Sequence, residues 1–109
     1  MQSFENTKHF LNTQKINTIR YFNSRQFFCP VGQSMCTYQF TVEVTPRLVI
    51  PDYLELDKYF NQLAKNMTIE DATLEVFEIF RITMNPLALK VTCLCEDAKH
   101  SKVEVIKEL

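Results

Sequence analysis

A thiol beside a predicted turn is the residue of this 109-residue chain best placed to do chemistry. Cys29 follows two phenylalanines and precedes Pro30, and Gly32 is the only glycine in the sequence. Because glycine adopts φ > 0 readily and lets the backbone approach a ligand, we expect a tight turn at Gly32 that presents Cys29. With a lowered pKa, such a thiol would be a nucleophile. The competing interpretation is that Cys29 is a small buried apolar residue.

The other three cysteines are weaker candidates. Cys36 begins a predicted strand and is a second possible nucleophile, with the same apolar alternative. Cys93 and Cys95 point to the same face of a later strand, and His100 follows five positions on. A structural zinc site needs four suitable ligands. Two thiols and one histidine therefore favour a core position, and we expect no metal.

Two carboxylates stand at the beginnings of predicted helices. Asp52 is expected to cap the first helix, with Glu55 three residues on completing a capping pattern. Glu70 follows the expected cap Thr68 and would oppose the positive end of the second helix dipole. A carboxylate also accepts two parallel hydrogen bonds, so Glu70 is a candidate anchor for a purine- or pterin-like ring. Periodicity alone favours the helix-terminus interpretation.

Composition and charge limit the class of protein. The net charge is −1 and acidic and basic residues are mixed, so we expect no direct contact with nucleic acid. No run of eighteen apolar residues is present, which predicts no membrane span. The first residues lack a secretory-type apolar segment, so we expect a cytoplasmic protein whose four cysteines are free thiols.

The pattern along the chain predicts a polar arm at residues 1–14 and a single domain at residues 15–109. Residues 15–28 are ambiguous, whereas residues 37–44 alternate strictly and predict a half-buried antiparallel strand. Two amphipathic helices are expected between residues 52 and 86, followed by strands at residues 88–95 and 102–106.

This order predicts an α+β fold in which two helices pack on one face of an antiparallel sheet. The outer strands of such a sheet have unpaired edges, which proteins cover or pair. We therefore expect a homo-oligomer that joins through its sheet edges, with any site at a subunit interface.

The spacing of these residues resembles the 7-cyano-7-deazaguanine reductase (QueF) family of the tunnelling-fold superfamily. Residues 28–33 resemble the family's Cys-Pro-x-Thr-Gly-Gln segment, and Glu70 with Asp71 matches the end of its Phe-His-Glu segment. Pro86 and the strand after it follow at the family's spacing. The likeness covers residues 27–95, and it implies a tunnelling fold.

The resemblance also implies a reaction. In that family a cysteine attacks a nitrile carbon to form a covalent thioimide, and two hydride transfers from NADPH then give the amine. Cys29 would be the nucleophile, Glu70 would anchor the deazaguanine ring, and Asp52 falls near an acidic residue before the family's first helix. The implied role is nitrile reduction in queuosine biosynthesis, a tRNA-modification pathway, with a small purine-like substrate and NADPH as cofactor.

Several positions depart from the family's pattern. The segment after Cys29 is one residue short, and Met35 occupies the place of the proton-donating aspartate. Ile69 replaces the histidine of Phe-His-Glu, and residues 98–100 carry no counterpart of the Arg-Gly-Gly segment that helps to hold the dinucleotide. Methionine cannot supply a proton, so the reduction lacks both a donor and a cofactor clamp.

Three hypotheses stay open at this point. The first is an enzyme that forms a thioimide through Cys29, with either a hydride donor or a different second reactant such as ammonia. The second is a non-catalytic subunit of the same fold that binds a purine or pterin or serves in assembly. The third is a pterin-handling relative, for which two histidines cannot supply the usual zinc-binding set.

Overall fold

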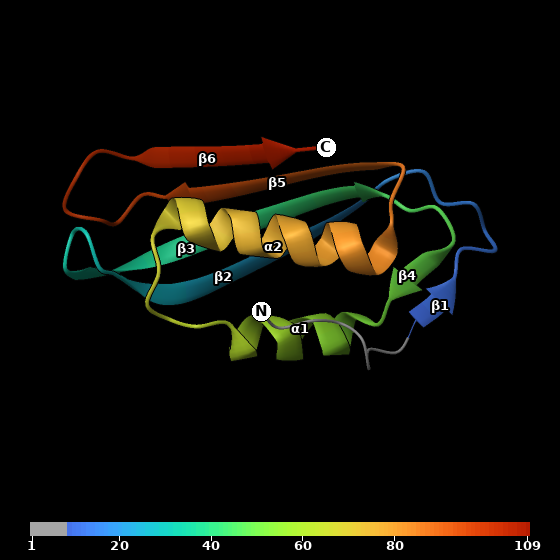
Figure 1. Cartoon of the computed structure of the whole chain (residues 1–109), viewed down its shortest axis with the longest axis horizontal. Helices are drawn as coiled ribbons and strands as arrows, with labels where there is room; N and C mark the ends of the chain where they lie inside the picture. The colour runs from blue at the N-terminus through green and yellow to red at the C-terminus, as the bar shows by residue number, and fades with distance from the viewer. Residues whose placement is uncertain (1–8) are drawn as a thin grey trace.

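The computed structural model describes residues 9–109, which form an α+β fold (Figure 1). The elements in chain order are β1 (His9–Leu11), β2 (Ile19–Cys29), β3 (Ser34–Thr45), β4 (Val49–Pro51), α1 (Tyr53–Gln62), α2 (Ile69–Met84), β5 (Ala88–Cys95) and β6 (Val103–Glu108). The long strands form an antiparallel sheet in the order β2-β3-β5-β6, and β1 pairs with β4 separately. The predicted α+β architecture is confirmed.

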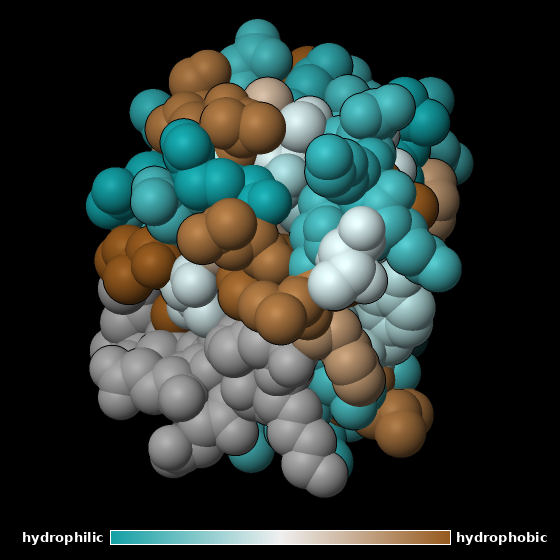
Figure 2. All heavy atoms as spheres, turned by 90° about the vertical axis from the view of Figure 1, so that its right-hand side faces the viewer, coloured by the Kyte–Doolittle hydropathy of each residue, from teal (hydrophilic) through white to brown (hydrophobic). Residues whose placement is uncertain are grey.

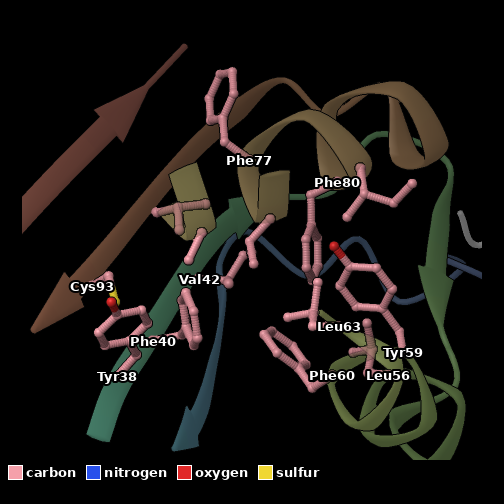
Figure 3. Packing of buried hydrophobic residues seen from close by; sticks show 14 of the residues in the cluster. Tyr38, Phe40, Val42, Leu56, Tyr59, Phe60, Leu63, Phe77, Phe80 and Cys93 are labelled. Atoms are coloured by element: carbon pink, nitrogen blue, oxygen red, sulfur yellow. The ribbon is translucent and has the colours of Figure 1, made fainter. Parts of the chain in front are cut away.

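The core lies between this sheet and the two helices. Alternate residues of β3 from Tyr38 to Val44 are buried, as their period of two predicts. Figure 3 shows Phe40 and Val42 of β3 turned toward the helices, and the rings of Phe40 and Phe60 lie 5.5 Å apart. This packing fixes both helices on the inner face of the sheet.

Both predicted helix caps are present. Asp52 Oδ1 accepts a hydrogen bond of 2.8 Å from the Leu54 N–H, and Thr68 Oγ1 accepts one of 3.2 Å from the Asp71 N–H. Each bond satisfies an N–H group that has no partner within its helix. The caps therefore set where α1 and α2 begin, and α2 ends before Asn85, which adopts the left-handed conformation.

The N-terminal half differs from the sequence expectation. Residues 15–28 were ambiguous, but β2 runs unbroken from Ile19 to Cys29 because every residue pairs with β3. The strands β1 and β4 were not expected. Of the predicted arm, residues 1–8 lie outside the described residues, whereas His9–Leu11 pairs with Val49–Pro51.

Apolar side chains gather at the end of the molecule that carries β1 and β4 (Figure 2). Leu11, Leu48 and Leu87 are more than half exposed there. Contiguous exposed apolar surface is typical of interaction sites. The predicted assembly of several copies stays a prediction. In residues 9–109, no helix has the length and apolar content needed to cross a membrane.

Candidate functional site

Cys29 is the last residue of β2 and lies directly at the β2–β3 turn. It pairs with Ser34, and its carbonyl accepts a hydrogen bond of 2.7 Å from the Gln33 N–H, which closes the turn. The Gly32 N–H lies 3.5 Å from the Cys29 sulfur and donates to it. The hairpin thus fixes the thiol against its own turn, with one backbone donor aimed at the sulfur.

The turn geometry corrects one expectation. Gln33, with φ of 52°, adopts the left-handed conformation, whereas Gly32 does not have a positive φ. A Cβ added at Gly32 would lie 3.7 Å from Ser34 Oγ and 3.9 Å from Cys29 Sγ, which is ordinary contact. The backbone conformation therefore does not require a glycine at position 32. What Gly32 supplies to the turn is the N–H group that faces the Cys29 sulfur.

The four thiols differ in exposure. Cys29 is half-buried and packs against the margin of the core, whereas Cys36, Cys93 and Cys95 are buried. Burial raises the pKa of Cys36 to about 11 and that of Cys93 to about 12, which keeps both as thiols at neutral pH. Cys36 is thus a poor nucleophile, and Cys29 is the cysteine that reagents in solution can reach.

Glu70 lies at the same end of the fold as Cys29. The segment before α2 runs beside the end of β2, where the Phe28 N–H donates to the Lys65 carbonyl at 2.6 Å. The Tyr38 hydroxyl donates to the Met67 carbonyl at 2.9 Å. Figure 1 shows the β2–β3 turn and the start of α2 gathered at one end of the sheet. The exposed Glu70 and the half-buried Cys29 therefore lie at the same end of the sheet.

Asp52 lies at the opposite end. It caps α1 immediately after β4, far from the start of α2 (Figure 1). Within one chain the fold therefore brings Cys29 and Glu70 to one end and leaves Asp52 at the other. Its visible role is the hydrogen bond to the Leu54 N–H.

Comparison with known proteins rests on structure. No family model and no curated protein match the sequence. The crystal structure of the archaeosine synthase QueF-Like in its apo form superposes with a TM-score of 0.76 and 21% sequence identity. The match covers 85% of this chain and 93% of that one. The chain has a QueF-like tunnelling fold. The fold expected from the spacing of Cys29, Glu70 and Pro86 is thereby confirmed.

One carboxylate at the Cys29 end of this QueF-like fold was missed by the sequence reasoning. Asp97, in the β5–β6 turn, accepts hydrogen bonds of 2.8 Å from both the N–H and the hydroxyl of Thr37. The backbone donor, followed by the hydroxyl, lowers the pKa of Asp97. Asp97 thus joins the β5–β6 turn to β3 through two hydrogen bonds from Thr37.

The residues considered for metal ligation lie in different surroundings. Cys93 and Cys95 are buried, whereas His100 is exposed in the β5–β6 turn, with Nδ1 2.7 Å from the Ser101 carbonyl oxygen. Across residues 9–109, no three His, Cys, Asp or Glu side chains are grouped so that they could hold a metal ion.

Proposed function

We propose that this QueF-like protein binds a 7-deazapurine nitrile of the 7-cyano-7-deazaguanine type and captures it covalently through Cys29. The observation that carries the proposal is a half-buried thiol on a hairpin turn, at the end of the sheet where α2 begins. The structural similarity to an archaeosine synthase supports a role in deazapurine metabolism.

The capture step balances without a cofactor. The Cys29 sulfur, as thiolate, forms a C–S bond to the nitrile carbon, and one C–N π bond breaks. The electron pair of that bond moves to the nitrile nitrogen, which takes up one proton from water and gives a thioimide. No group leaves, so the protein gains the whole mass of the ligand.

Glu70 is proposed to hold the ring. Its carboxylate can accept two parallel N–H bonds from the amino-pyrimidinone edge of the ligand. Glu70 is exposed, and neither of the two cavities described for this chain includes it or Cys29. We propose that a neighbouring copy in a homo-oligomer completes the site. Asp52 lies at the other end of the fold, so we propose that it enters such a site only from a second copy.

The fate of the thioimide separates two candidate functions. Reduction requires two hydrides from NADPH and a proton donor, and Met35 cannot be that donor. Because Met35 leaves the reduction without that donor, a non-reducing role is the second candidate: binding alone, or addition of a nitrogen nucleophile such as ammonia. Oxidation of NADPH in the presence of the nitrile would identify the reductase.

Calorimetry with 7-cyano-7-deazaguanine tests ring binding. Glu70→Gln removes the charge from two hydrogen bonds, each worth roughly 1.5–3 kcal/mol when charge-assisted, so we expect affinity to fall at least about tenfold. Asp71→Asn is the matched control, because Asp71 is exposed in the same helical turn and only its backbone N–H serves the Thr68 cap. Equal affinity of wild type and Glu70→Gln would remove Glu70 from the proposal.

A further inference from the structure

A cavity of about 280 Å³ lies between β2 and α1. On β2 it is lined by Tyr21 and Asn23, which point to the helix side of the sheet. On α1 it is lined by Tyr53, Asp57 and Phe60, which the helical period brings to one face. Small-molecule sites combine apolar walls with a few polar groups in this way, although most are somewhat larger.

Two polar atoms of the cavity residues have no hydrogen-bond partner within residues 9–109. They are Tyr21 Oη and Asn23 Oδ1, and both atoms are buried. Burial, together with the nearby Tyr53, raises the pKa of Tyr21, so its hydroxyl stays neutral and can donate or accept. Because buried polar groups are nearly always satisfied, two such atoms in one cavity point to a ligand that hydrogen-bonds there.

The walls of the cavity suit a flat ring. Tyr21 and Tyr53 are arranged edge to face with their ring centres 5.5 Å apart, and Phe60 lines the same space. The exposed Asp57 adds a second acceptor to the lining of the same cavity. Two acceptors next to aromatic walls favour a heterocycle that carries an amino group.

Two cations neighbour the residues that line the cavity. Arg25 follows Asn23 on the same side of β2, about 7 Å further along the strand, and its Nε donates to Asn61 Oδ1 of α1 at 3.0 Å. Lys65 Nζ lies 5.3 Å from the ring centre of Phe27. Phe27 is the next residue after Arg25 on this side of β2, so the two cations lie near each other, and burial followed by the charge of Arg25 lowers the pKa of Lys65.

Neither cation is neutralised by the protein. In the part of the chain from residue 9 onward, the ion pairs involve other residues and do not include Arg25 or Lys65. Arg25 also donates through Nη1 to the Ser24 carbonyl, and Lys65 Nζ donates to the Phe60 carbonyl at 3.0 Å. These acceptors are neutral, so the two positive charges and their remaining N–H donors are suited to an anion such as phosphate. A ring-sized cavity and two uncompensated cations therefore lie next to each other on the helix side of β2.

We propose that the groove between β2 and α1 binds an amino-purine mononucleotide, with the base against Tyr21 and Asn23 and the phosphate at Arg25 and Lys65. The base end of the site is separate from Cys29, which lies six residues beyond Asn23 on β2, about 20 Å away, whereas Lys65 lies beside Phe28 at the phosphate end. None of the residues proposed to bind the nucleotide takes part in nitrile capture, so the two proposals can be tested separately.

Calorimetry with AMP, adenosine, UMP and inorganic phosphate tests this site. We expect AMP to bind more tightly than adenosine or phosphate alone, and more tightly than UMP, whose base lacks an exocyclic amino group. Arg25→Gln should weaken AMP about tenfold and leave adenosine unchanged. The matched control is Arg47→Gln, which removes an exposed arginine that donates to the Asn85 carbonyl outside the groove; it should change neither ligand.

Three results would overturn the proposal. They are no binding of AMP at millimolar concentration, equal binding of AMP and phosphate, and equal AMP affinity in Arg25→Gln and the wild type. A change in oligomeric state in Arg25→Gln without a change in AMP affinity would assign the groove to a second copy of the chain instead.

A conservative variant separates binding from folding. Tyr21→Phe removes a hydroxyl that has no partner in the described chain, so thermal stability without ligand should be unchanged or higher. AMP affinity should nevertheless fall about fivefold. Loss of stability without ligand, or unchanged AMP affinity, would contradict the placement of the base against Tyr21.

Discussion

The hydroxyl of Tyr38 is expected to hold the two halves of the Cys29 end together. Tyr38 is 1% exposed, its ring stacks on Phe27 with centres 4.5 Å apart, and its hydroxyl donates to the Met67 carbonyl at 2.9 Å. Tyr38→Phe keeps the ring and its packing but leaves that carbonyl without this donor. A typical intramolecular hydrogen bond is worth about 1 kcal/mol, so the free energy of unfolding should fall by about that amount.

Urea denaturation followed by circular dichroism measures this change. With a slope of about 1.5 kcal/mol/M for a protein of this size, the midpoint of Tyr38→Phe should fall by about 0.7 M. The matched control is Tyr53→Phe, because Tyr53 is 60% exposed and the same chemical change there should leave the midpoint unaltered. Hydrogen exchange of residues 67–70 should also accelerate in Tyr38→Phe. Equal midpoints and unchanged exchange in both variants would refute this role for the bond.

Four further results follow from the same structure. Alkylation of the native protein at pH 8 should modify Cys29 first and leave Cys36 and Cys93 unmodified until the protein unfolds. Modification of the Cys93 thiol before unfolding would contradict its burial. Because the folded pKa of Cys36 is raised from 9.0 to about 11, stability should fall as pH rises through this window, and Cys36→Ala should flatten that part of the profile. Thr68→Ala should lower the free energy of unfolding by about 1 kcal/mol through loss of the α2 cap, measured by urea denaturation; an unchanged midpoint would contradict it. Asp97 has a lowered pKa, so its stabilising effect is present above about pH 4 and lost as pH falls further, and Asp97→Asn should remove that loss from an acid titration.

The second half of the fold follows from local sequence signals. Thr68 and Pro86 bracket α2 with a cap and a helix-stopping residue, and β5 occupies the 88–95 range that its pattern predicts. These signals act over a few residues, so no distant partner is needed to interpret them. The alternation of β3 is equally local, because one face of the strand is buried under the helices.

The first half depends on contacts between distant residues. Asn23 and Arg25 interrupt the apolar pattern of β2, yet they point to the helix side because the register with β3 fixes the strand. Pairing of His9–Leu11 with β4 joins segments about 40 residues apart. Asp97 likewise accepts a hydrogen bond from Thr37 of β3, and no spacing along the chain predicts this contact.

The roles of the candidate site residues stay predictions. Cys29 and Glu70 could be selected by residue type and spacing, and the fold brings them to one end of the sheet. A site shared between two copies of the chain depends on assembly, so that part of the site remains a prediction. The turn conformation was predicted at Gly32 but occurs at Gln33, the last residue before β3, whose N–H closes the turn on the Cys29 carbonyl.

Intact-mass spectrometry after incubation with 7-cyano-7-deazaguanine tests the central claim most directly. The wild-type protein should gain the full mass of one ligand per chain, Cys29→Ala should gain none, and Cys93→Ala should react like the wild type. No adduct on the wild type, or an adduct that persists in Cys29→Ala, would contradict covalent capture at Cys29.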